Sequence, residues 1–241
     1  MSEPLRRDSS NRILAALADE DYARLAPYLE RVALDSGLIL HRIEQPVDYI
    51  YFPETMVVSL LNMMSDGSTV EVGVVGKDGI AGISPLLGSE RALMQTIVQI
   101  PGEALRVGTH LLKEEFNRGG ELQAVLLRYT RSLMAQVAQR AVCNSLHTIE
   151  QRLARWLLMS RSLVDSDELP LTQEFIARML GTRRAGVSQA ASMLQDAGLI
   201  SYARGHINIL ELEELERAAC ECYQVVKSQS ESMPKEVAGG A

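Results

Sequence analysis

Residues 171–200, LTQEFIARMLGTRRAGVSQAASMLQDAGLI, decide the fold of the C-terminal part of this 241-residue chain. Apolar residues recur at a spacing of three to four over residues 172–180, which predicts a short amphipathic helix. Gly181 then interrupts the pattern, and glycine readily takes the positive φ that follows a helix end. Thr182 is a good N-cap for a second helix, whose apolar stripe begins at Val187. Two short helices joined by a tight glycine turn predict a helix-turn-helix motif, in which the second helix enters the major groove of DNA.

The outer face of the second predicted helix carries side chains that suit DNA, and no acidic residue occurs from 182 to 195. Arginine can donate two hydrogen bonds to guanine, glutamine can pair with adenine, and serine or threonine can contact a base or a phosphate. We predict DNA contacts from this helix, from the start of the preceding helix and from the following hairpin: Thr172, Gln173, Thr182, Arg183, Arg184, Ala185, Ser188, Gln189, Arg204 and His206. The alternative is a plain helical hairpin with a solvated polar face.

The net charge of −7, taken alone, argues against a nucleic-acid partner. The charge is uneven, however, because basic residues slightly outnumber acidic ones between residues 148 and 206. Phosphate contact depends on this local field, and the acids Asp165, Asp167 and Glu168 can face away from it. The chain has neither an apolar stretch long enough to cross a membrane nor a clear secretory signal, so we expect a cytoplasmic protein.

The three cysteines are too few for a disulfide framework. Cys220 and Cys222 form a lone C-x-C with no histidine beside it, and we interpret these thiols and Cys143 as structural or incidental. An iron–sulfur cluster needs about four thiolates, and His41 and His110 are candidates for haem ligation by residue type only. The sequence therefore predicts no metal and no cofactor.

Short apolar or β-branched runs follow one another before residue 108, separated by turn signals such as Asp66-Gly67. Such runs predict an antiparallel barrel or sandwich. The predicted strands are residues 31–34, 38–41, 49–52, 57–63, 69–75, 95–100 and 104–107. A helical pattern precedes them over residues 10–29.

A helix-rich half begins near residue 109. A long helix from Gly119-Gly120 to about residue 145 has a wide apolar stripe, which fits burial in its own domain or pairing with a second copy. If it pairs, we expect Leu126, Leu133 and Val137 in the seam. A polar break at residues 144–148 and a helix at 149–163 lead to the helix-turn-helix. Strands at 200–203 and 207–210 then form a hairpin in the place of a wing, residues 211–229 look helical, and residues 232–241 are predicted to be disordered.

This order of parts resembles the Crp/Fnr superfamily of bacterial transcription regulators, over roughly residues 30–212 and most sharply from 172 to 210. The resemblance implies an α+β fold with five parts: an N-terminal helical segment (1–29), an antiparallel β-roll like a cyclic-nucleotide-binding domain (30–108), a connecting and dimerisation helix (109–147), a winged helix-turn-helix (148–214), and a C-terminal helix with a tail (215–241). It also implies a homodimer on a palindromic double-stranded operator with half-sites about 34 Å apart, and contact with RNA polymerase.

Three positions of the second helix match those at which members of this family read bases, namely Arg184, Ala185 and Gln189. An acidic residue often stands at the middle position. Ala185 can touch only a thymine methyl group there, so the operator should differ from the best-known consensus at that base pair.

The segment GKDGIAGISPLLGSERALMQ departs from the family's cyclic-nucleotide pattern. Relatives bind the ribose through a glutamate, whereas no acid occurs here from residue 79 to 89. Arg91 lies near the place of the phosphate-binding arginine, although an arginine beside Glu90 suits a solvated ion pair. Buried ribose hydroxyls without a partner cost about 1–3 kcal/mol each. We therefore predict that cyclic AMP is not the effector, and the effector itself stays open.

The sequence also bears on two other classes of protein, an enzyme and a protein-interaction module. A cupin-like enzyme needs two or three histidines on neighbouring strands, and the chain also lacks G-x-S-x-G, a P-loop and G-x-G-x-x-G. We therefore predict no enzyme activity. A winged helix used only for protein contacts would expose an apolar or acidic second helix, so this class remains the runner-up.

Overall fold

The structure is a computed structural model that describes residues 9–164 and 166–231. The tail at 232–241, for which disorder is predicted, lies outside these residues. Internal contacts divide the chain into two units, one of Met1–Val58, Val75–Leu133 and Ser230–Ala241, the other of Ser59–Val74 and Met134–Gln229. The division falls within two strands and one long helix, so neither unit is a single stretch of sequence.

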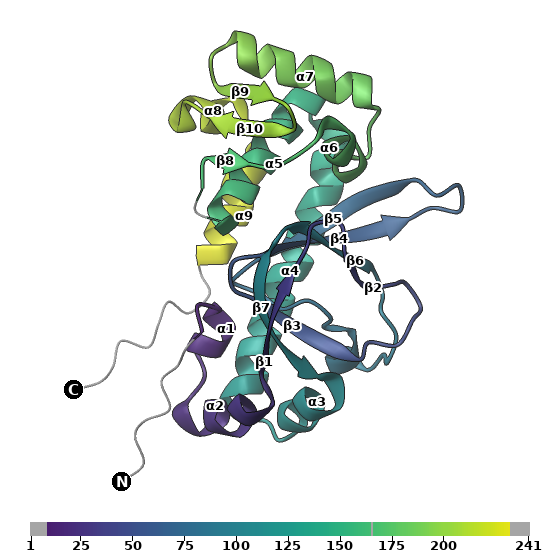
Figure 1. Cartoon of the computed structure of the whole chain (residues 1–241), viewed down its shortest axis with the longest axis vertical. Coiled ribbons are helices and arrows are strands. Elements are labelled where there is room, and N and C mark those ends of the chain that lie inside the picture. The colour runs from purple at the N-terminus through teal and green to yellow at the C-terminus, as the bar shows by residue number, and fades with distance from the viewer. Residues whose placement is uncertain (1–8, 165, 232–241) are drawn as a thin grey trace, which may run out of the picture. The chain divides into compact units, whose positions relative to one another are not determined.

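Figure 1 labels the α-helices and the strands of the chain. The helices are α1 (Arg12–Ala15), α2 (Asp19–Leu25), η1 (Ala26–Tyr28), η2 (Ser84–Leu87), α3 (Thr109–Asn117), α4 (Gly120–Leu146), α5 (Ile149–Val164), α6 (Gln173–Leu180), α7 (Arg184–Asp196), α8 (Leu212–Ala218) and α9 (Cys222–Glu231). The strands are β1 (Glu30–Leu34), β2 (Ile39–His41), β3 (Tyr49–Pro53), β4 (Val57–Met63), β5 (Thr69–Val75), β6 (Gln95–Ile100), β7 (Gly102–Gly108), β8 (Glu168–Leu169), β9 (Ile200–Ala203) and β10 (His206–Ile209).

The strands before residue 108 form two sheets, with the orders β1-β7-β3 and β2-β6-β4-β5. The pairs β1–β7, β3–β7 and β2–β6 are antiparallel, as the short strands and their turns predict. Consecutive residues are buried along β3, β4 and β6, where Ile50, Phe52 and Val98 are fully enclosed. The mixed helix and strand fold with N-terminal antiparallel sheets, a long helix and a C-terminal helix-turn-helix is thereby confirmed.

A buried asparagine anchors the short N-terminal helix α1. The side-chain oxygen of Asn11 accepts hydrogen bonds from the backbone N–H groups of Ile13 and Leu14, so it caps the helix. Its amide nitrogen donates to the carbonyls of Pro53 and Gly79, each at 2.9 Å. Every polar atom of the side chain therefore has a partner, which is how a buried amide avoids a desolvation penalty.

The second unit is built around α5, which packs against α6, α7 and α8 (Figure 1). Trp156, Leu153 and Leu157 of α5 are completely buried. A three-stranded sheet, β8-β10-β9, completes the winged helix-turn-helix. The two-residue strand β8 is absent from the sequence prediction, because so short a run has no periodicity to detect.

A buried carboxylate links the β4–β5 hairpin to the helices of the second unit. Glu71 is fully buried, and its Oε1 lies 2.6 Å from Nη1 of Arg140 and 3.0 Å from the donating Nε1 of Trp156. Ser59 donates its hydroxyl to the other oxygen at 2.8 Å. The hairpin thus belongs to the second unit through a polar network that has no exposure to water.

Two helix boundaries differ from expectation. The polar break at residues 144–148 is shorter than predicted, because α4 continues to Leu146. The helical stretch over 211–229 is in fact α8 and α9, separated at residues 219–221. None of the described helices is both long and apolar enough to span a bilayer.

Candidate DNA interface

Helix α6 begins and ends as its sequence predicts. The hydroxyl of Thr172 accepts a hydrogen bond from the backbone N–H of Phe175 at 3.2 Å, which caps the helix start. Gly181 ends the helix with φ of 59° and ψ of 43°, and a Cβ there would lie 2.9 Å from the side chain of Val70. Arg152 donates to the carbonyl of Leu180, so a C-terminal carbonyl of α6 also has a partner.

The start of α7 differs from the prediction by one residue. The helix begins at Arg184 and its N-cap is Arg183, which makes no side-chain capping bond. Thr182 was expected to be the cap. Its backbone N–H instead donates to the carbonyl of Ala177 at 3.0 Å, as in a Schellman motif, so Thr182 belongs to the end of α6.

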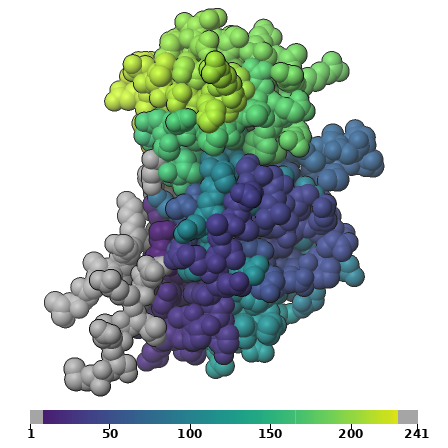
Figure 2. Space-filling model, in the orientation of Figure 1, coloured from purple at the N-terminus to yellow at the C-terminus, as the bar shows by residue number. Residues whose placement is uncertain are grey.

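Helix α7 has one buried face and one solvent-exposed face, as a DNA-recognition helix requires. Val187, Ala190, Ala191 and Leu194 are buried, and Gly186 lies so close to α5 that a Cβ would come within 2.9 Å of the Ile149 side chain. The opposite face is open to solvent, and Figure 2 shows the green atoms of the helix-turn-helix segment at the surface. Exposed residues on the first two turns and the N-cap are Arg183, Arg184, Ala185 and Gln189, while Thr182 and Ser188 are half-buried.

The β9–β10 hairpin has a tight two-residue turn with an arginine at its tip. Arg204 has φ of 50° and Gly205 has φ of 82°, the pair of positive values that a type I′ turn needs. Arg204 is exposed there. The wing is tied to α6 because the backbone N–H of Gln173 donates to the hydroxyl of Tyr202 at 3.1 Å. Thr172, Gln173 and the arginine tip therefore belong to one connected surface.

His206 is a predicted DNA contact whose side chain already has an acidic partner within the chain. Its Nδ1 lies 3.0 Å from a carboxylate oxygen of Glu168 in β8. The sequence predicts that Glu168 lies in a loop that can face away, whereas it lies in the two-residue strand β8, which pairs with β10. Asp167 is occupied as well, since Arg161 donates to it at 2.5 Å.

The segment at residues 79–89 is filled by its own apolar side chains. Ile80, Ala81, Ile83 and Leu86 are all buried. The hydroxyl of Tyr129 in α4 donates to the carbonyl of Ile80 at 2.8 Å, and burial raises the pKa of this tyrosine above its ordinary value. The predicted absence of a ribose acceptor thus coincides with a packed segment.

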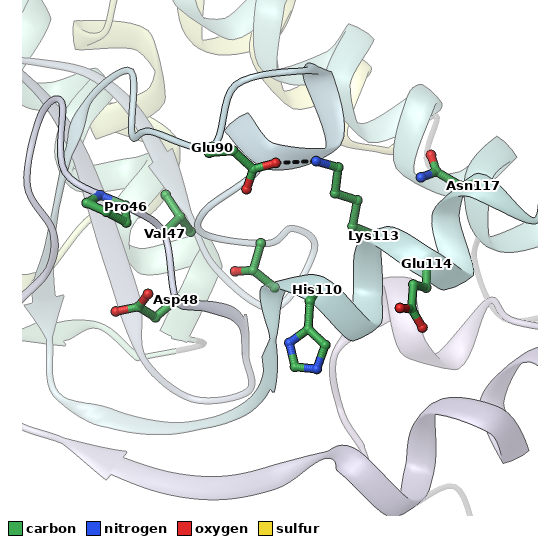
Figure 3. Close-up of a pocket in the computed structure, with 9 residues that line it drawn as sticks. Pro46, Val47, Asp48, Glu90, His110, Lys113, Glu114 and Asn117 are labelled. Carbon is green, nitrogen blue, oxygen red and sulfur yellow. Dashed lines mark hydrogen bonds and ion pairs between the residues drawn. The ribbon is translucent and has the colours of Figure 1, made fainter.

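The charged residues after this segment are not paired as expected. Glu90 forms an ion pair with Lys113 of α3, whereas the guanidinium of Arg91 donates to the carbonyl of Glu44 at 2.5 Å. Figure 3 shows the Glu90–Lys113 pair at a pocket of about 440 Å³. Its lining combines apolar, polar and charged residues: Pro46, Val47, Asp48, Glu90, Thr109, His110, Lys113, Glu114 and Asn117.

His41 is a structural side chain. It is buried, its Nε2 donates to the carbonyl of Tyr49 at 2.8 Å, and its Nδ1 lies 3.0 Å from the hydroxyl of Thr96. Burial lowers the pKa of His41 below its ordinary value, so the ring is neutral at physiological pH. Both ring nitrogens are engaged within the fold.

The structure brings together the three cysteines, which the sequence indicates only as structural or incidental thiols, and a histidine for which it predicts no role. Cys143, His147, Cys220 and Cys222 converge in the second unit. Their separation along the chain conceals this, because neither C-x-C nor a cysteine four residues before a histidine is informative alone.

Comparisons with known proteins agree with this geometry. Residues 151–218 match the family model of the Crp-like helix-turn-helix domain. No curated protein matches the chain in sequence. Among solved structures, a transcriptional regulator of the Crp/Fnr family from Eubacterium rectale is 17% identical with a TM-score of 0.68, covering 84% of this chain and 94% of its own.

Two further structures show the same fold. FixK2 from Bradyrhizobium japonicum is 17% identical with a TM-score of 0.68, over 80% of this chain and 98% of its own. TTHB099, a CRP-family transcriptional regulator from Thermus thermophilus, is 20% identical with a TM-score of 0.63, over 79% and 96%. The chain thus contains a Crp-like helix-turn-helix domain and has the fold of the Crp/Fnr family of transcription regulators.

Proposed function

We propose that this protein reads a specific DNA sequence as a homodimer, with α7 of each protomer in the major groove of one half of a palindromic operator. The observation that carries the proposal is the exposed, acid-free start of α7, with Arg183, Arg184 and Gln189 beside the arginine-tipped wing. Such a surface concentrates positive charge locally although the whole chain is acidic. A protein-interaction module would expose an acidic or apolar face here. The start of α7 exposes a basic and polar face instead.

The roles of the side chains follow from their positions. Arg184 and Gln189 lie on the exposed face within the first two turns, where base edges come within reach of a recognition helix. Arg183 lies at the N-cap, where the free N–H groups of the helix start favour phosphate. Thr172, Gln173 and Arg204 provide further phosphate contacts from α6 and the wing, and His206 contributes less because Glu168 pairs with it.

Helix α4 supplies the proposed dimer seam, on residues other than those the sequence indicates. Of the three residues expected in the seam, Leu126 and Leu133 are buried within the single chain and Val137 is half-buried, so the first two have little surface to offer a second copy. Leu127 and Met134 are 49% and 69% exposed, and Val142 is 46% exposed. With the exposed Ala138 and Ala141 they form one stripe at the spacing of a coiled-coil seam. A second copy of α4 is the partner that this stripe fits.

Replacing Arg184 tests sequence reading. Arg184→Ala should weaken binding to an operator selected from random DNA by about 1–3 kcal/mol and relax the preference at one base pair in each half-site. The matched control is Arg183→Ala, which should weaken binding to operator and random DNA alike and reduce the slope of affinity against salt by about one. Fluorescence anisotropy at several salt concentrations measures both. Equal losses on operator and random DNA for Arg184→Ala would contradict the assignment.

Cyclic AMP is not the effector in this proposal. The acid-free segment 79–89 offers no carboxylate to the ribose, and its apolar side chains are already packed. Titration calorimetry with cyclic AMP and cyclic GMP should show no binding at micromolar concentrations. Micromolar binding that tightens when operator DNA is present, as reciprocal linkage requires, would overturn this part of the proposal. RNA polymerase is retained as a proposed partner of the DNA-bound dimer on the resemblance alone.

A further inference from the structure

Four potential metal ligands converge at the end of α4 and the start of α9. The sulfur atoms of Cys143, Cys220 and Cys222 and a ring nitrogen of His147 all lie within 4.8 Å of one another. The Sγ atoms of Cys143 and Cys220 are 3.5 Å apart, and Nδ1 of His147 is 3.5 Å from Sγ of Cys222. All three cysteines are free thiols and are buried.

These distances match one tetrahedral metal ion. Zinc binds thiolate at about 2.3 Å and imidazole at about 2.0–2.1 Å, so neighbouring ligand atoms around it lie roughly 3.5–3.8 Å apart. An iron–sulfur cluster distributes its ligands over two or more iron atoms and needs them further apart than this group allows. The geometry therefore fits a single metal ion bound by three cysteine sulfurs and one histidine nitrogen.

The surroundings of the group orient its ligands. Nε2 of His147 lies 3.2 Å from a carboxylate oxygen of Glu221, which leaves Nδ1 facing the thiols. Metal-binding histidines usually engage a carboxylate in this way through the second ring nitrogen. Gln139 donates from Nε2 to Sγ of Cys222 at 3.0 Å, which holds this sulfur in place beside the other ligand atoms.

Buried positive charge nearby suits a site of this kind. Arg140, Arg152 and Arg155 are all buried, and guanidinium nitrogens of each have no hydrogen-bond partner among the described residues. Glu71 neutralises only one of them, through Arg140. Three thiolates around a divalent ion leave one net negative charge, which offsets part of this excess.

We propose that Cys143, His147, Cys220 and Cys222 bind one zinc ion. Four protein ligands leave no position open for a substrate or water, so the site is structural and not catalytic. The ligands lie on both sides of the Crp-like domain at residues 151–218, two before it and two after it. The ion therefore links the segment before the helix-turn-helix domain to the segment after it. This inference does not rest on sequence-specific DNA binding.

The test uses the full chain without an affinity tag, purified under reducing conditions. Elemental analysis should find one zinc per chain, and Cys143→Ser and Cys222→Ser should each abolish retention of the metal through purification. The matched control Ser145→Ala, an exposed hydroxyl on the same helix, should leave zinc unchanged. Glu221→Gln should keep the ion but weaken its affinity by about tenfold, because it alters only the orientation of His147.

A second measurement covers the case in which the cysteine variants do not fold. Reduced wild-type protein stripped of metal should take up one Co²⁺, with the visible absorption of tetrahedral cobalt and sulfur-to-cobalt charge transfer in the near ultraviolet. Added zinc should displace it and raise Tm. The proposal is overturned if the reduced protein contains no zinc and gives no cobalt spectrum, or if Cys143 and Cys220 form a disulfide and no metal binds.

Discussion

Glu71→Ala is expected to lower the free energy of unfolding of the second unit by about 3–5 kcal/mol. The substitution leaves the guanidinium of Arg140 buried without its carboxylate, and it also removes the acceptor of Trp156 Nε1. Burial lowers the pKa of Arg140 to about 10 even though Glu71 raises it, so Glu71 stabilises the charged form of this buried group. Trp156 is the only tryptophan of the chain, and its fluorescence during urea unfolding reports on this site directly.

Two variants separate the stranded charge from a general packing defect. Glu213→Ala removes a carboxylate that is 90% exposed, and its effect should stay within about 0.5 kcal/mol. Glu71→Leu combined with Arg140→Met replaces the ion pair with apolar groups of similar size and should recover most of the lost stability. If the double variant is as unstable as Glu71→Ala, the buried charge is not the cause.

Met134→Asp is expected to convert the protein to monomers and to reduce operator affinity by about a thousandfold or more. Met134 lies at the centre of the exposed stripe on α4, so the aspartate would be buried without a partner when two copies pair. A single half-site keeps little beyond non-specific affinity, which is typically three or more orders of magnitude weaker than specific binding. Analytical ultracentrifugation measures the assembly and anisotropy measures the affinity.

Arg128→Asp is the matched control for the seam. It introduces the same side chain on the same helix, about one quarter turn away from the stripe, and removes only an exposed ion pair with Glu121. We expect it to remain a dimer with near-normal operator binding. A Met134→Asp protein that sediments as the wild type does would move the interface away from α4.

The sequence predicts most of the fold because its signals are local. Strands β4, β5 and β6 begin and end at the predicted residues, since apolar or β-branched runs and turn signals such as Asp66-Gly67 indicate them without reference to the rest of the chain. The glycine turn and the opposed faces of α7 identify the helix-turn-helix for the same reason. The prediction that Thr182 caps α7 was wrong. Thr182 lies between the end of α6 and the start of α7, and its capping propensity does not indicate which of the two helices it stabilises.

What the sequence does not predict depends on contacts between distant residues. Helix α4 has apolar residues on more than one side, and only the folded unit shows that Leu126 and Leu133 face its own core while Leu127 and Met134 do not. Cys143 and Cys220 are 77 residues apart, so neither predicts the other. Glu71 looks like an ordinary exposed strand residue until its partners on α4 and α5 are known.

The position of Glu71 limits how the C-terminal helix-turn-helix domain could be exchanged between proteins by gene fusion. A recombination joint placed at residue 148 would transfer Trp156 and the helix-turn-helix, but it would leave the β4–β5 hairpin behind. The transferred indole would then lack the acceptor that holds it at 3.0 Å. Val70, which touches the turn at Gly181, would be lost with it. A DNA-binding domain transferred in this way would therefore need a β4–β5 hairpin with matching residues in the recipient protein. We expect the hairpin and the helix-turn-helix to evolve together.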